Sequence, residues 1–108
     1  MIVAFSVAPA GGESDSVSAA VAEAVRVVAD SGLPYELNAM FTLIEGEWDE
    51  VMGVVRRAVE AASAGATRTS LVLKADIRPG YTNQLQAKVD RVRQQLANPG
   101  PRHGDISG

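Results

Sequence analysis

The chain is 108 residues long, and with 46% hydrophobic and 21% charged residues it has the composition of one globular domain. The absence of cysteine excludes disulfide scaffolds, thiolate nucleophiles and cysteine-ligated metal sites. A net charge of −3 offers no basic surface for nucleic acid. Residues 1–10 are apolar but lack the basic flank of a signal peptide and are too short to span a membrane. We therefore expect a cytoplasmic protein that binds neither nucleic acid nor membranes.

The first third of the chain predicts one strand and one helix. Residues 2–8 are rich in β-formers and almost continuously hydrophobic, as in a strand covered on both faces. A helix over 16–31 follows from N-cap residues at its start and from Gly32 and Pro34 at its end. Its apolar residues recur at helical spacing: Val17, Val21, Ala24, Val25 and Val28.

The middle of the chain predicts two strands and a second helix. Residues 35–45 show the two-residue alternation of an extended chain. The segment is long enough for two strands joined by a tight reversal, and Asn38 is a suitable turn residue. Between Gly46 and Gly65 an amphipathic pattern predicts a helix, with acidic residues favourably placed in its first turn.

The last third predicts a strand, a helix and a tail. Residues 67–76 are typical of a strand, and Pro79 and Gly80 stop it. A helix over 82–97 carries Leu85, Val89, Val92 and Leu96 on one face. Residues 98–108 contain too little apolar surface to offset the entropy of ordering, so we expect a disordered tail after a domain that spans 1–97.

The predicted order β-α-β-β-α-β is that of an α+β, ferredoxin-like fold: an antiparallel sheet with two helices on one face and here an extra C-terminal helix. The strands carry apolar residues on both faces of the sheet, so the second face must also be covered. The third helix, another subunit, or both could cover it. We favour association of subunits through this sheet face, which predicts a homo-oligomer.

No catalytic constellation is evident in the sequence. Ser6 has no histidine to activate it, because the one histidine, His103, lies in the predicted tail. Polar residues within apolar strands, such as Asn38 and Thr42, must face solvent or find a hydrogen-bond partner. Asp76 and Arg78 stand two apart at a strand end, which fits either a surface ion pair or a site. Trp48 fits a packing residue at a helix start or a ring that stacks on a ligand.

Several blocks of the sequence, taken together, resemble the small YkoF-like thiamine-binding protein family. These blocks span about residues 1–97 and are IVAFSVAP at 2–9, VAEA at 21–24, SGLPYEL at 31–37, TLIEGEWDEV at 42–51 and KADIR at 74–78. The most specific part is the tyrosine-glutamate-leucine strand followed by the glutamate-glycine pair at 45–46 and a helix. The family usually has proline and glycine around the hairpin methionine, where this chain has Ala39 and Phe41.

The resemblance implies a ferredoxin-like subunit, assembly into dimers or tetramers through sheet faces, and binding of thiamine or its hydroxymethylpyrimidine part without turnover. It also implies no cofactor and no metal. The residues that match the family's binding positions are Ser6, Thr42, Glu45, Asp76 and Arg78.

The chemistry of such a ligand agrees with the residue types available. Thiamine has a cationic thiazolium and an aminopyrimidine with donor and acceptor edges, so its site needs a carboxylate, hydroxyl or amide groups and an aromatic wall. Glu45 could supply the carboxylate, Ser6, Thr42 and Asn38 the polar groups, and Trp48 or Phe41 the wall. Two alternatives remain: a cofactor-free enzyme with Asp76 or Glu45 as general base, and a structural or regulatory oligomerisation domain.

Overall fold

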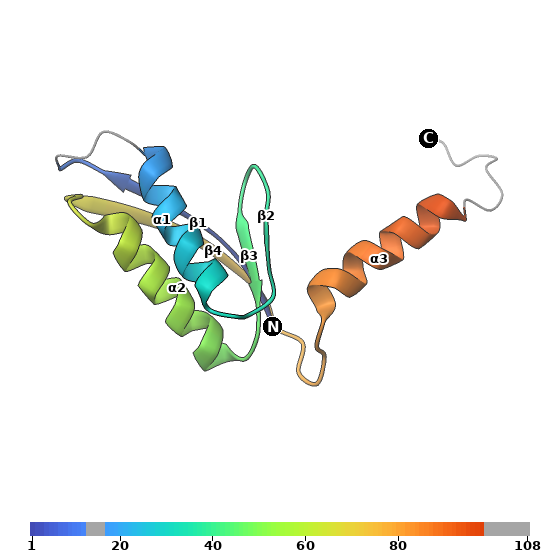
Figure 1. Cartoon of the computed structure of the whole chain (residues 1–108). Coiled ribbons are helices and arrows are strands. Elements are labelled where there is room, and N and C mark those ends of the chain that lie inside the picture. Colours follow the sequence, from blue (N-terminus) through green and yellow to red (C-terminus); the bar gives the residue numbers. More distant parts are fainter. Residues whose placement is uncertain (13–16, 99–108) are drawn as a thin grey trace.

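The structure, a computed structural model, describes residues 1–12 and 17–98. Within these residues it has four strands and three helices in the order β-α-β-β-α-β-α. They are β1 (Ile2–Ala10), α1 (Val17–Asp30), β2 (Tyr35–Leu37), β3 (Thr42–Glu45), α2 (Trp48–Ser63), β4 (Arg68–Asp76) and α3 (Gln84–Ala97) (Figure 1). This order confirms the predicted ferredoxin-like fold with an extra C-terminal helix. Most of the predicted tail lies outside the described residues.

The four strands form one antiparallel sheet in the order β2-β3-β1-β4. Strand β1 is central and pairs with β4 over its whole length, from Ile2 opposite Asp76 to Ala10 opposite Arg68. This pairing extends the first strand two residues beyond the predicted end. On its other side β1 pairs with β3 only from Ile2 to Phe5, so residues 6–10 have no strand neighbour there.

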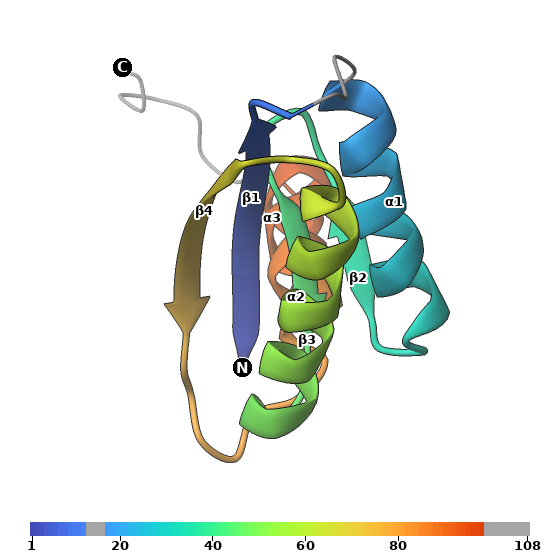
Figure 2. The same cartoon turned by 90° about the vertical axis from the view of Figure 1, so that its left-hand side faces the viewer.

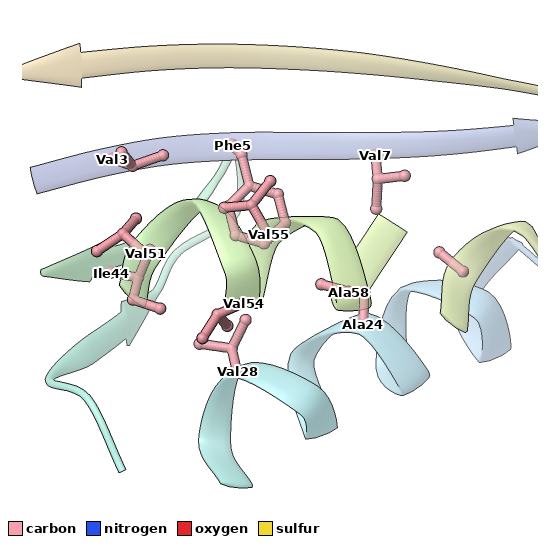
Figure 3. Close-up of a cluster of buried hydrophobic side chains, with 11 residues drawn as sticks. Val3, Phe5, Val7, Ala24, Val28, Ile44, Val51, Val54, Val55 and Ala58 are labelled. Atoms are coloured by element: carbon pink, nitrogen blue, oxygen red, sulfur yellow. The ribbon is translucent and has the colours of Figure 1, made fainter. Parts of the chain in front are cut away.

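The core lies between the sheet and the two helices that cover one of its faces (Figure 2). In β1, every second residue from Val3 to Val7 points toward α1 and α2 (Figure 3), as the period of a strand requires. The helices contribute small and β-branched residues that are almost fully buried: Ala24, Val28, Val51, Val54, Val55, Ala58 and Ala62. The amphipathic patterns predicted from the sequence therefore do face a common core.

The predicted reversal between β2 and β3 is confirmed and spans four residues. The side-chain oxygen Oδ1 of Asn38 accepts hydrogen bonds from the backbone N–H groups of Met40 and Phe41, both at 2.8 Å. The backbone N–H of Asn38 in turn donates to the carbonyl of Phe41 at 3.0 Å. Asn38 thus builds the turn with its side chain, which is a common role of asparagine.

This reversal corrects the single alternation that the sequence suggested across 35–45. In the ladder, Tyr35 lies opposite Ile44 and Leu37 opposite Thr42, so these four side chains share the face that the helices cover. Leu43, which the sequence pattern grouped with Tyr35 and Leu37, lies on the other face. The pattern failed because the turn contains an even number of residues. An even number interrupts the alternation, so odd-numbered residues of β2 share a face with even-numbered residues of β3.

Helix α3 covers only one end of the second face of its own sheet, where its first turn encloses Glu45. It lies on the side of the sheet away from α1 and α2 and points away from it (Figures 1 and 2). Along the helix the exposed fraction of the apolar stripe rises from 7% at Leu85 to 59% at Val92 and 75% at Leu96. The radius of gyration is 17.3 Å, against about 13 Å for a compact domain of this length. Within one chain, the rest of the sheet face stays open.

Candidate functional site

A cavity of about 180 Å³ lies between α1, the side of β1 that β3 leaves unpaired, and the β2–β3 hairpin. A cavity of about 150 Å³ can hold a benzene ring, so this one has room for one six-membered ring. Among the residues that the structure describes, no charged side chain lines it. Its lining residues are Phe5, Ser6, Val7, Val21, Ala24, Val25, Leu37, Asn38, Ala39, Met40, Phe41 and Thr42.

Thr42 is the buried polar residue of this cavity. It is only 7% exposed, because β3 carries it onto the face that α1 and α2 cover. The structure gives its hydroxyl group no hydrogen bond to any described residue. A buried hydroxyl without a partner costs roughly 1–3 kcal/mol, so this group is poised to bond to a molecule in the cavity.

Two further polar elements border the cavity. Ser6 is half-buried, but it alternates with Phe5 and Val7, so its side chain belongs to the opposite face of the sheet. At Ser6 it is the backbone that borders the cavity, because β1 is no longer paired with β3 there. Asn38 uses its amide oxygen in the turn, and its amide NH2 has no partner among the described residues. The cavity thus combines hydroxyl, amide and strand-edge groups with apolar walls.

Glu45 lies elsewhere, on the open face of the sheet. Its carboxylate is buried, with 5% of the residue exposed, and it accepts the backbone N–H groups of Gln84 at 2.7 Å and Leu85 at 3.1 Å. These N–H groups belong to the first turn of α3, where no intrahelical acceptor exists. Both oxygens of Glu45 are therefore engaged in capping α3.

Asp76 and Arg78 lie near Glu45, at the base of α3, and do not pair with each other. Asp76 forms an ion pair with Lys88 of α3, and the hydrogen bond and charge of Lys88 lower the pKa of the Asp76 carboxyl. Arg78 stacks on the ring of Tyr81, with its guanidinium carbon 3.7 Å from the ring centre. The ion pair links the end of β4 to α3, and the stacking contact lies within the segment that joins them.

Trp48 stands apart from both groups. It is the first residue of α2 and is 55% exposed. It is not among the residues that line the cavity, and the aromatic wall there comes from Phe5 and Phe41 instead. Of the seven residues singled out from the sequence, Asn38, Thr42 and Ser6 line the cavity, but the Ser6 side chain belongs to the opposite face of the sheet. Glu45, Asp76 and Arg78 form a second group, and Trp48 belongs to neither.

Some relevant residues were not singled out from the sequence. Val21 and Val25 of α1 line one wall of the cavity, but in the sequence their spacing indicates only a buried helix face. Lys88 and Tyr81, which hold Asp76 and Arg78, lie in or beside the C-terminal helix and form no motif with them. The unpaired stretch of β1 was also missed, since the sequence does not reveal how far β3 extends.

A family model described as thiamine-binding protein matches residues 3–93. The chain belongs to this family. The match begins in β1 and ends within α3, so it includes both the cavity and the base of the C-terminal helix. The resemblance read from the sequence blocks is thereby confirmed.

Members of the thiamine-binding protein family and related chains cover nearly the whole length of this one. A UPF0045 protein of Mycobacterium bovis is 53% identical over 100 residues, 92% of this chain and 97% of that protein. One of Methanothermobacter thermautotrophicus is 38% identical over 94 residues, 85% of this chain and 95% of that protein.

Among solved structures, a Bacillus cereus domain of unknown function has a TM-score of 0.76 at 36% identity and covers 87% of this chain and 90% of its own. A Thermotoga maritima protein, described as a candidate thiamine biosynthesis or salvage protein, has a TM-score of 0.72 at 27% identity, covering 85% and 97%. The family name points to binding, not to catalysis.

Two features are absent from the described residues. They contain no group of three or more histidine, aspartate or glutamate side chains able to hold a metal ion. In the same part of the chain, no helix is both long and apolar enough to cross a membrane.

Proposed function

We propose that this protein binds thiamine, or its hydroxymethylpyrimidine part, in the cavity between α1 and the hairpin, without chemical turnover. The observation that carries the proposal is the buried hydroxyl group of Thr42, which has no hydrogen-bond partner among the described residues, in a ring-sized cavity that none of their charged side chains lines. The family to which the chain belongs supports the identity of the ligand.

The uncharged lining favours the neutral pyrimidine as the part that enters the cavity. An aminopyrimidine presents donors and acceptors on its edge and an apolar face, and the cavity offers the Thr42 hydroxyl, the Asn38 amide and aromatic walls from Phe5 and Phe41. The cationic thiazolium would lose its hydration there without gaining a counter-ion. We therefore place the thiazolium at the mouth of the cavity, toward solvent.

Glu45 enters this proposal as a residue that positions α3. The expectation from the resemblance, that Glu45 balances the ligand charge, requires its carboxylate to lie beside the ligand, but Glu45 does not line the cavity. Both carboxylate oxygens instead accept N–H groups of α3. Asp76 and Arg78 are likewise engaged with Lys88 and Tyr81.

The cavity favours binding over the alternative of a cofactor-free enzyme. General acid–base catalysis needs a titratable side chain within hydrogen-bond reach of the reacting atoms. The carboxylates considered for that role, Glu45 and Asp76, do not line the cavity. The other alternative, a structural or regulatory domain, predicts no saturable ligand binding and is tested by the same experiment.

The test is calorimetric titration of the protein with thiamine, hydroxymethylpyrimidine and the thiamine phosphates. We expect saturable binding of both thiamine and hydroxymethylpyrimidine. The variant Thr42→Val keeps the shape of the side chain and removes its hydroxyl group. It should weaken both ligands about fivefold, corresponding to about 1 kcal/mol for one hydrogen bond.

Thr82→Val is the matched control, because the same change is made at an exposed residue, and it should leave both affinities unchanged. If the unmodified protein bound none of these pyrimidines at millimolar concentration, the proposed function would be wrong. Equal affinities for the Thr42→Val and Thr82→Val variants would remove Thr42 from the site.

We also propose that the protein acts in the cytoplasm as a homo-oligomer, a dimer or tetramer, through its open sheet faces. The open face supports this proposal, because apolar residues lie near its centre, beside Lys74 and Ser6. Ala4 and Leu43 lie opposite each other there, and Val72 of β4 is 56% exposed. A monomer would leave this surface in water, which is unfavourable for a small domain.

A further inference from the structure

Met40 differs from the other two methionines of the chain in both exposure and position. Its side chain is 73% exposed, and it lines the cavity between α1 and the hairpin. Met1 and Met52 are partly buried, and neither lines this cavity. Because the chain has no cysteine, its thioethers are the sulfur groups open to oxidation. A chemical change at Met40 would therefore take place in contact with solvent and at the wall of the ligand site.

The backbone of the turn that carries Met40 is fixed at the free end of the β2–β3 hairpin (Figure 1). Asn38 accepts the backbone N–H groups of Met40 and Phe41 with its side-chain oxygen, both at 2.8 Å. The N–H of Asn38 donates to the carbonyl of Phe41 at 3.0 Å. None of these bonds uses an atom of the Met40 side chain, which is long, unbranched and adaptable. The turn thus holds a flexible thioether at the edge of a fixed cavity.

The surroundings of Met40 in the cavity wall are apolar and aromatic. Leu37 and Ala39 come just before it in the wall, and Phe41 follows it. A thioether is polarisable and makes favourable contacts with aromatic rings, which are worth about a two- to tenfold change in an equilibrium constant. The sulfur of Met40 therefore suits a wall that covers the ring of a pyrimidine.

We propose that Met40 is an oxidative modification site, and that its conversion to methionine sulfoxide by a hydroperoxide weakens ligand binding in the cavity. This inference rests on the proposed function, because the affinity that changes is the affinity of the cavity for a pyrimidine. It adds a chemical control of the site by the redox state of its surroundings.

The reaction needs the thioether and the peroxide. A lone pair of the Met40 sulfur attacks one oxygen of hydrogen peroxide, so that a sulfur–oxygen bond forms and the oxygen–oxygen bond breaks. The proton of the transferred oxygen leaves with the departing hydroxide as water. Sulfur is oxidised by two electrons, and the peroxide is reduced by two. Methionine sulfoxide reductases reverse the change, so the modification can act as a switch.

The sulfoxide group is unfavourable for the ligand site for two reasons. Its oxygen is polar and hydrated, so a ligand that covers it must remove water from it. It is also a hydrogen-bond acceptor at the wall that carries the Thr42 hydroxyl and the Asn38 amide, the donors proposed for the pyrimidine. Oxidation of Met40 therefore replaces an apolar ring contact with a competitor for polar ones.

The first test is the rate of oxidation of each methionine, followed by peptide mass spectrometry in dilute hydrogen peroxide. Met40 should oxidise at least about fivefold faster than Met52, because susceptibility follows exposure. Saturating hydroxymethylpyrimidine should slow the oxidation of Met40 and leave the rate at Met52 unchanged. This protection places the ligand against Met40.

The second test is calorimetric titration with hydroxymethylpyrimidine after the peroxide has been removed. The oxidised protein should bind about fivefold more weakly than the untreated protein, and treatment with methionine sulfoxide reductases should restore the affinity. Met40→Leu cannot be oxidised at this position, so its own affinity should be equal before and after peroxide. Met52→Leu is the matched control and should respond to peroxide as the unmodified protein does.

Three results would overturn the inference: equal oxidation rates at Met40 and Met52, an unchanged affinity once Met40 is fully oxidised, or a loss of affinity on peroxide treatment of Met40→Leu. The denaturation midpoint of the oxidised protein should stay the same, since Met40 is mostly in water, and this separates lost affinity from lost folding. Absence of pyrimidine binding before oxidation would contradict the proposed function. Binding that peroxide leaves unchanged would contradict only the role of Met40.

Discussion

Thr42 and Glu45 lie three positions apart in β3, and this spacing gives them different roles. Alternation in β3 carries Thr42 to the face that the helices cover and Glu45 to the open face. Both are almost fully buried, yet for different reasons. Thr42 is enclosed by the core and the cavity, whereas Glu45 is enclosed by the start of α3.

At the residue scale we predict that Glu45→Gln loosens α3 and leaves the ligand site intact. Glutamine keeps one acceptor oxygen but loses the charge that favours a helix N-terminus and the second strong acceptor. Amide hydrogen exchange at Gln84 and Leu85 should accelerate about tenfold, corresponding to about 1.4 kcal/mol. Glu60→Gln, an exposed residue of α2, is the matched control.

The affinity for thiamine should change less than twofold in Glu45→Gln, because Glu45 does not line the cavity. A selective loss of thiamine affinity with unchanged affinity for hydroxymethylpyrimidine would contradict this prediction. That result would return Glu45 to the ligand, as the counter-ion of the thiazolium.

At the scale of elements, α3 is attached to the sheet by polar contacts more than by its apolar stripe. One residue of the stripe, Leu85, is buried at the base, and beyond it the attachment depends on the Glu45 cap and on the Lys88–Asp76 ion pair. By contrast, α1 and α2 are attached through continuous apolar contacts. All three helices carry apolar residues at helical spacing, but α3 is the most polar, and only the first two belong to the core.

The ion pair predicts how acid affects this attachment. Lys88 lowers the pKa of Asp76 in the folded protein below 3.8, the ordinary value of an aspartate side chain. The unfolded chain therefore takes up the proton first, and the pair contributes stability above pH 3.8 that is lost as the pH falls through the lower, folded-state pKa. Carbon-13 NMR titration of the Asp76 carboxyl should show a midpoint below 3.8.

The same titration of Lys88→Gln should move the Asp76 midpoint upward, and Arg93→Gln on the same helix should move it little. An unchanged midpoint in Lys88→Gln would mean that the pair does not form in solution. Because the pair is exposed to solvent, added salt should also raise the midpoint.

At the scale of the molecule, stability resides in the layer between the sheet and the first two helices. Ile44 is fully buried in this layer, whereas Ile77, just after β4, is 58% exposed. Ile44→Ala should lower the free energy of unfolding by about 2–5 kcal/mol, through lost burial and the cavity left behind. Ile77→Ala makes the same change and should cost less than about 0.5 kcal/mol.

Denaturant unfolding of both variants, at equal protein concentration, measures this difference. Equal concentration matters because association stabilises the folded state and makes the midpoint depend on concentration. If Ile77→Ala destabilised as much as Ile44→Ala, Ile77 would be buried in solution, which would indicate a contact between copies that the single chain lacks.

The amino-acid sequence by itself determined the order of the elements, the fold and the family. Periodicity is a local property, so Val3, Phe5 and Val7 indicate a strand, and the valines of α1 a buried helix face, without knowledge of their partners. Asn38 indicated that a turn lies in this segment but not its position, which the hydrogen bonds of its side chain to residues two and three positions away show.

Only the tertiary structure decided where the site residues lie and what α3 does. The four-residue turn set the register that carries Thr42 into the cavity, and the late start of β3, at Thr42, left part of β1 unpaired. The engagement of Glu45 with α3 joins residues about 40 positions apart in the chain. Such contacts depend on register and on long-range packing, which local patterns do not encode.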